Sequence, residues 1–390
     1  MGLTTLIYTS LLALGVFSFD AWHHGGEINL EINIPKGYGA SETSITDTVA
    51  ENLFLNEIAD IDAVPTFVVK PRVRSTNEHT VVSMIGDMLG LKKMTLLIQR
   101  ATGLEPLVIN GSVTKRNDRY QLVLVSNPEA GANQRLIQTI ETSPGEPVVQ
   151  MIRRAAPQAM LSYQDYLVCL YLVGKATSGD LKTYEASFEK PGFEGLDLLI
   201  QQRMLLQPTG LAGIEASDNI NERQAMFTNL RGMLALAQND DKKAASLFEE
   251  ALKIRSSFSI AALNLAFMRV HQDRYQDAIE LVSALIKSGN LDGSPMMLGP
   301  AYTTWGVAAW GLGKQDEAAA LFNTANVVNP RATLANLYWG EMLNRQGNTI
   351  EAAAKRKLAL DNSKYFSPYA ETAILFYRLT PDSNAALTKL

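Results

Sequence analysis

The sequence is poor in the residues that build disulfides and metal centres. Its 390 residues include one cysteine and four histidines. A single cysteine excludes a disulfide within the chain and any cysteine-rich zinc or iron–sulfur site. So few histidines also leave little for a histidine-built metal site. We therefore expect neither a metal nor another cofactor.

An excess of positive charge is also missing. The 35 basic and 40 acidic residues give a net charge of −5, so no overall basic field attracts nucleic acid. The 46% apolar content excludes a disordered or collagen-like chain. At about 150 residues per domain, the length predicts two or three globular domains.

The usual catalytic motifs are absent as well. The sequence contains no G-x-S-x-G elbow, Walker loop, H-E-x-x-H motif or dinucleotide fingerprint. The glycine-rich stretch 37–41 precedes Glu42 and Asp47, whose negative charges would repel a phosphate. We therefore predict that the chain is not an enzyme, and we assign no catalytic residue.

An uncharged, mostly apolar stretch covers residues 3–19, close to the shortest helix that spans a bilayer. We predict that residues 1–24 form a membrane anchor and that the bulk of the chain is extracytoplasmic, in the periplasm. No basic residue precedes Lys36, and no A-x-A-type cleavage site follows the stretch. An atypical signal peptide and a buried globular segment remain alternatives, as does a start inside a longer protein.

Residues 25–157 have the pattern of a small α/β domain. Polar and apolar residues alternate over 27–35, which predicts a strand. Ser44, with Asp47 three positions later, predicts the start of a helix. The apolar stripe expected on this helix is Val49, Leu53 and Ile58.

Strands and helices continue to alternate through this region. The turn residues 117–118 lie between two β-rich runs and predict a hairpin. We expect further strands at 66–70, 107–113, 120–125 and 135–141, and further helices at 80–102 and 144–156.

Three short motifs in this region match a known family: Gly103-Leu104, Gly111-Ser112-Val113 and Asn117-Asp118-Arg119. On these residues the region resembles the TolB N-terminal-like domain, which often precedes helical repeats in CadC-like membrane-anchored regulators. The resemblance implies an α/β fold and a role in signalling or regulation.

A repeat dominates residues 221–364. Its anchor positions are Ala244, Ala278, Ala318 and Ala352. The intervals between them are 34, 40 and 34 residues, and a Gly/Pro-rich loop at 288–300 accounts for the longer one. Glycine precedes the alanine by twelve positions in three copies, and phenylalanine follows it by four in two copies: Gly232, Gly306 and Gly340, and Phe248 and Phe322.

On these positions the segment resembles the tetratricopeptide repeat. The resemblance implies helix–turn–helix pairs that stack into an all-α solenoid. Arg356 stands where a large apolar residue is expected, which places that copy near the end of the array. We expect residues 158–220 to form a helical connector or degenerate repeat, and residues 365–390 a capping helix and tail. The predicted fold class is therefore α+β.

The first helix of each repeat is expected to line a concave surface. Carried over from the repeat, the partner-binding residues are Asn229, Met233, Leu263, Phe267, His271, Thr303, Val307, Trp310, Leu337, Glu341, Asn344 and Arg345. Apolar residues in the middle and polar residues at one end suit an extended or helical peptide. The alternative is that this face packs on the chain's own α/β region.

Together these features predict a non-catalytic, membrane-tethered scaffold or sensory protein that binds a protein partner. It would bind no nucleic acid. The alternative is an assembly or export factor of a cell-envelope secretion or polysaccharide machine.

Overall fold

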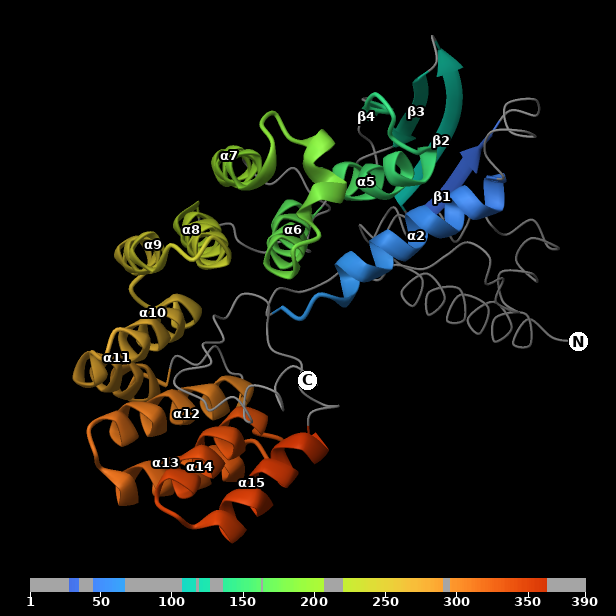
Figure 1. Cartoon of the computed structure of the whole chain (residues 1–390). Coiled ribbons are helices and arrows are strands. Elements are labelled where there is room, and N and C mark those ends of the chain that lie inside the picture. The colour runs from blue at the N-terminus through green and yellow to red at the C-terminus, as the bar shows by residue number, and fades with distance from the viewer. Residues whose placement is uncertain are drawn as a thin grey trace, which may run out of the picture. The chain divides into compact units, whose positions relative to one another are not determined.

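The computed structural model describes residues 28–34, 45–66, 107–116, 119–126, 136–162, 164–206, 220–289 and 295–362. The chain divides into two compact units, one containing residues 1–199 and 206–218 and the other residues 200–205 and 219–390. The described residues are mostly helical and include one four-stranded sheet (Figure 1).

Several predicted segments lie outside the described residues. They are the anchor at 1–24, the helix at 80–102, the cap and tail at 365–390, and nearly all of the strand at 66–70. Within the described part of the chain, no helix combines the length and the apolar composition needed to cross a bilayer.

The sheet of the first unit contains β1 (Ile28–Asn33), β2 (Leu107–Arg116), β3 (Arg119–Ser126) and β4 (Leu136–Glu141). The strands lie in the order β1-β2-β3-β4. β1 is parallel to β2, and the other neighbours are antiparallel. The predicted hairpin is therefore confirmed as β2 and β3.

Two helices, α2 (Asp47–Ala63) and α5 (Val148–Met160), pack against the sheet and against each other. α2 contacts β1, and α5 contacts β3 and β4. Buried side chains between these layers include Leu30, Ile32, Phe54, Ile58, Ile109, Leu122, Leu124 and Ile152. A Cβ atom on Gly111 would lie 3.1 Å from both Ile32 and Leu124, so this glycine lets the strand lie under a tightly packed core.

The predicted start and stripe of α2 need correction. Thr46, not Ser44, is the N-cap, and its hydroxyl accepts a hydrogen bond from the Val49 backbone N–H at 3.3 Å. Val49 is 41% exposed, while Phe54 and Ile58 are buried. The buried face of α2 is formed by Ala50, Phe54, Glu57, Ile58 and Ile61.

Carboxylates of α2 cover the outer edge of β1. Glu51 accepts a hydrogen bond from the Ile32 backbone N–H at 3.1 Å, and Asp47 accepts one from the Ile34 N–H at 2.7 Å. Both amides point away from β2, where no strand of the described sheet pairs with them. Side chains therefore satisfy donors that the end of a sheet would otherwise leave open.

The first unit continues with α6 (Asp165–Ser178), the 3₁₀ helix η1 (Leu181–Ser187) and the start of α7 (Gly192–Leu205). Gly179 has a φ of 81° and ends α6, and a short 3₁₀ helix follows it within the predicted helical connector. The buried carboxylate of Glu57 accepts hydrogen bonds from the hydroxyls of Tyr171 and Tyr184. These contacts join α2, α6 and η1.

Over residues 220–289 and 295–362, the second unit contains four consecutive helix pairs: α8 (Ile220–Ala237) with α9 (Asp241–Ile254), α10 (Ser259–His271) with α11 (Tyr275–Lys287), α12 (Pro295–Gly311) with α13 (Gln315–Val328), and α14 (Thr333–Arg345) with α15 (Thr349–Asn362). Each pair packs internally and contacts the next (Figure 1). The predicted helical repeat region is confirmed.

The turn inside each pair has the same backbone conformation. Its left-handed residues are Asn239 (φ 59°), Asp273 (60°), Gly313 (79°) and Gly347 (84°). Their intervals are again 34, 40 and 34 residues. The residue after each left-handed residue donates its backbone N–H to the carbonyl oxygen five positions earlier, at 2.8–3.0 Å. This hydrogen bond and the left-handed residue define a Schellman turn.

The extra residues of the third repeat are only partly a loop. Pro295, within the predicted loop 288–300, begins α12, and Pro300 lies inside that helix. α12 therefore has 17 residues, whereas α10 and α14 have 13 each.

The repeated glycines are positions of close helix approach. A Cβ atom on Gly232 would lie 2.4 Å from the ring of Phe248, and one on Gly306 would lie 2.7 Å from the ring of Phe322. Each aromatic ring thus packs directly on the backbone of the first helix of its own pair. This explains the spacing of glycine and phenylalanine found in the sequence.

Candidate partner-binding surface

All twelve predicted partner-binding residues lie on the first helices of the pairs, α8, α10, α12 and α14. The buried members are Asn229, Leu263, Phe267, Thr303, Val307, Leu337 and Glu341. These residues are buried because the first helices are surrounded by other helices; α10, for example, packs against α9, α11 and α12. In this structure, these buried side chains contribute to packing between helices.

The accessible members form a smaller set, which we call the accessible row: Met233, His271, Trp310, Asn344 and Arg345. Each lies in the last turns of its first helix, near the turn inside the pair. The side chains of His271 and Arg345 are 44% and 45% exposed, and the other three are half-buried.

An aromatic–cation contact links two repeats within the accessible row. The Arg345 guanidinium of α14 lies 5.1 Å from the centre of the Trp310 ring of α12. Its Nε also donates a hydrogen bond of 2.9 Å to the Glu341 carboxylate, which holds the guanidinium in place. The result is a rigid, partly exposed surface of indole and guanidinium.

The contacts of Arg356 account for its departure from the repeat pattern. Its Nη2 lies 3.2 Å from Glu341 Oε2, and the Glu341 side chain is fully buried. A Cβ atom on Gly340 would lie 3.1 Å from Arg356 Cγ, so the aliphatic part of Arg356 fills the place that Phe248 and Phe322 fill elsewhere. The charged end then pairs with a carboxylate.

Metal-binding or catalytic chemistry does not follow from the accessible row. His271 Nδ1 lies 3.3 Å from Asp241 Oδ2, and both side chains are over 40% exposed. Among the described residues, no group of three or more histidine, cysteine or acidic side chains is placed to hold a metal ion.

Two polar features were not predicted from the sequence. Asn264 Nδ2 donates a 2.8 Å hydrogen bond to Asn229 Oδ1, and both side chains are fully buried between repeats. On another face of α14, Lys355 Nζ lies 3.3 Å above the Trp339 ring. Burial lowers the pKa of Lys355, partly opposed by the charge of Glu351. Of these four residues, only Asn229 occupies a position that the repeat pattern marks, and the pattern does not predict its hydrogen bond to Asn264.

Comparison with known families supports the repeat assignment. The model of the tetratricopeptide repeat family matches residues 229–295 and 303–365. Over these residues, the helix pairs of the second unit are similar to tetratricopeptide repeats. Each match spans two helix pairs, and the break between them coincides with the longer interval before the third repeat.

Solved structures similar to the chain include several of MamA. "MamA 41-end from Desulfovibrio magneticus RS-1" is 15% identical, with 51% of this chain and 98% of that chain covered and a TM-score of 0.33. "Crystal structure of MamA" is 16% identical, with 49% and 94% covered and a TM-score of 0.33. These scores are too low to assign a common fold to the whole chain. No curated protein matches the sequence.

Proposed function

We propose that the chain is a non-catalytic scaffold that binds a protein partner through its tetratricopeptide repeats. The observation that carries this proposal is the run of four stacked helix pairs with equivalent turns. Each pair covers only part of its neighbours, so the stack offers an extended surface of the type that binds peptides.

In this proposal the partner contacts the accessible row, with Trp310 and Arg345 as its centre. Tryptophan and arginine are enriched among residues that dominate binding energy. Arg345 is already oriented by Glu341, so little side-chain freedom is lost when a partner binds. The buried members of the predicted set would support this surface from below.

A membrane tether and a regulatory setting are further parts of the proposal. Residues 3–19 carry no charge and are mostly apolar, which favours an anchor in residues 1–24. The bulk of the chain would then be periplasmic. The TolB-like motifs of the first unit favour a sensory or docking role for that unit.

A pull-down from solubilised membranes tests the binding surface. The bait is the full chain, compared with a variant that carries Trp310→Ala and Arg345→Ala. We expect at least tenfold lower recovery of the partner with this variant. The matched control carries Trp339→Ala and Lys355→Ala, which removes the same type of aromatic–cation contact from another face. Equal recovery with the two double variants would contradict the proposed surface.

Deletion of residues 1–24 tests the tether separately. We expect the shortened chain to leave the membrane fraction while its circular dichroism spectrum stays helical. Retention in the membrane fraction after a high-salt wash would show that another surface attaches the chain.

A further inference from the structure

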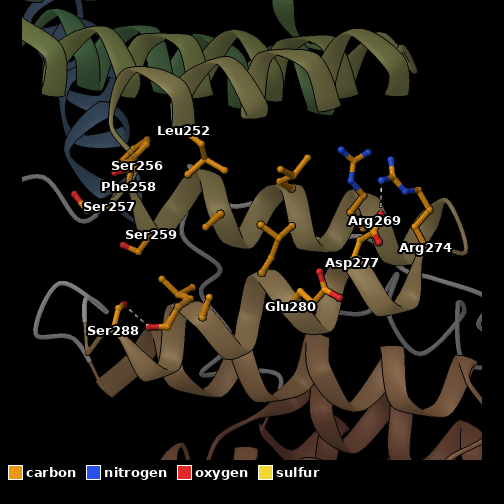
Figure 2. A pocket seen from close by; sticks show the side chains of 15 residues that line it. Leu252, Ser256, Ser257, Phe258, Ser259, Arg269, Arg274, Asp277, Glu280 and Ser288 are labelled. Atoms are coloured by element: carbon orange, nitrogen blue, oxygen red, sulfur yellow. Dashed lines mark hydrogen bonds and ion pairs between the residues drawn. The ribbon is translucent and has the colours of Figure 1, made fainter.

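A groove lies between the second helices of the first two pairs. Its walls come from α9 and α11, and its floor from α10 (Figure 2). It has a volume of about 690 Å³. We call it the α9–α11 groove. It is distinct from the accessible row, because Arg269 of the groove and His271 of the accessible row differ by two positions on α10, or about 200° around the helix.

The groove has an apolar middle and two polar ends. Leu252, Leu265 and Leu281 line the middle. Figure 2 shows Arg269, Arg274 and Asp277 gathered at one end. At the other end lie Ser256 and Ser257 of the α9–α10 turn, Ser259 at the start of α10, and Ser288. An apolar side chain would fit the middle, while hydroxyls at one end offer partners to a peptide backbone.

The last two repeats contain the equivalent space, which allows an internal comparison. The anchor alanines Ala244 and Ala318 are 74 positions apart, and so are Ala278 and Ala352. The same shift relates Leu265 to Trp339, Leu281 to Lys355, Leu252 to Asn326 and Ala262 to Asn336.

In the last two repeats, larger or polar side chains of the chain itself occupy this space. The indole of Trp339 lies beneath Lys355, with the ammonium 3.3 Å from the ring centre. Asn336 Nδ2 donates a 2.7 Å hydrogen bond to Asn326 Oδ1. At the equivalent positions of the α9–α11 groove, three leucines and an alanine leave the space open. The equivalent backbone positions thus hold an indole in the last two repeats, whereas the α9–α11 groove has no indole at its position.

The charged side chains at the rim of the groove indicate which charge a ligand should carry next to its aromatic group. Arg269 pairs with Glu249 and also donates a 2.9 Å hydrogen bond to Gln272, while Arg274 pairs with Asp277. Both cations therefore already have a carboxylate. Glu280 is exposed, and its carboxylate accepts a 3.4 Å hydrogen bond from the neutral amide of Gln276. A carboxylate held only by an amide attracts a cation from a ligand.

We infer that the α9–α11 groove binds a segment of a partner protein through an aromatic side chain next to a basic residue. The aromatic ring lies over Leu265, as the ring of Trp339 does in the equivalent site. The basic residue pairs with Glu280, and the segment's backbone extends toward the serines of the α9–α10 turn.

Methyl NMR of the full chain with labelled leucines tests this inference. The probes are three capped tetrapeptides whose central residues are tryptophan-lysine, tryptophan-glutamate and leucine-lysine. We expect the tryptophan-lysine peptide to shift the methyl signals of Leu252, Leu265 and Leu281 with a dissociation constant of about 1 mM, a weak affinity suited to so short a ligand. The other two peptides should bind at least fivefold more weakly.

Three variants sharpen the test. Leu265→Trp fills the groove as Trp339 fills its own site, so it should weaken binding at least tenfold. Glu280→Lys changes only an exposed side chain and should reverse the preference between lysine and glutamate. In a chain with Trp339→Leu and Lys355→Leu, the peptide should shift a second set of signals in α14 and α15.

Two results would overturn the inference. One is the absence of shifts at the three groove leucines with about 10 mM of the tryptophan-lysine peptide, tenfold above the expected constant. The other is equal binding of all three peptides. If Leu265→Trp fails to fold, an unchanged peptide preference in Glu280→Lys still overturns the proposed pairing.

Discussion

The buried carboxylate of Glu341 is paired with Arg356 at 3.2 Å, at two positions that are apolar and buried in the preceding repeat. The residues 34 positions earlier are Val307 and Phe322, both buried. The two repeats therefore differ at both positions, with an ion pair in one and two apolar side chains in the other. A carboxylate alone in that place would carry a large desolvation cost, and so would a guanidinium without a partner.

The first prediction concerns this pair. Arg356→Met should lower the free energy of unfolding by roughly 2–4 kcal/mol, somewhat below the 3–5 kcal/mol for breaking a buried pair, because Arg345 still holds Glu341. The double variant Glu341→Val with Arg356→Phe recreates the preceding repeat and should recover most of that loss. Urea unfolding followed by circular dichroism measures both. A double variant no more stable than the single one would contradict the pairing.

The second prediction concerns the left-handed turns. Asn239 occupies a position where two other repeats have glycine. Asn239→Gly should raise stability by about 0.5 kcal/mol, and Gly313→Ala should lower it by about 1–2 kcal/mol, because a Cβ atom is unfavourable at positive φ. Gln238→Gly is the control, since it lies outside the left-handed position and should destabilise. Thermal unfolding of the three variants gives the order, and a stabilising Gln238→Gly would refute the explanation.

The third prediction concerns the close approach of helices at Gly232. Gly232→Ala should cost about 1–3 kcal/mol, because its methyl group would collide with the ring of Phe248. Combining it with Phe248→Leu should cost less than the sum of the two single changes. Gly174→Ala is the matched control, since a Cβ atom on this helical glycine meets nothing within 4 Å. Strict additivity would show that the two residues do not contact as described.

The fourth prediction concerns alkaline pH. Burial, and hydrogen bonding to Glu57, raise the pKa of Tyr171 and of Tyr184. In the unfolded chain both tyrosines ionise near pH 10, while in the folded chain they stay neutral. Their contribution is therefore complete below about pH 10 and declines above it, by about 1.4 kcal/mol per pH unit for each group.

Unfolding in urea at pH 8 to 11.5 measures this decline. In the variant with Tyr171→Phe and Tyr184→Phe the slope above pH 10 should be smaller, even if the variant is less stable at pH 8. An unchanged slope would assign the alkaline loss to other tyrosines.

The sequence predicted the repeats well because their physical requirements are local and periodic. Gly232 and Phe248 must be 16 positions apart for a ring to lie on a helix backbone, and the pattern repeats at Gly306 and Phe322. The strands β2 and β3 were predicted for a similar reason, since a turn and two alternating runs are adjacent in the chain.

Contacts between residues distant in sequence could not be predicted in this way. Glu57 meets Tyr171 more than one hundred residues later, and no spacing rule links them. The start of α2 could not be predicted, because Ser44 and Thr46 are both common cap residues and local sequence does not show that Asp47 contacts β1. The burial of Leu263 and Phe267 could not be predicted, because it depends on helices contributed by neighbouring repeats.

The hydrogen bonds from Ile32 and Ile34 to the acids of α2 have a consequence for self-association. A strand of another molecule that paired with β1 would have to accept hydrogen bonds from these two amides, which already donate to Glu51 and Asp47. It would also bring its carbonyl oxygens up against two carboxylates. Growth of the sheet by addition of another molecule is therefore disfavoured on the side of β1, and molecules crowded together are protected from joining there.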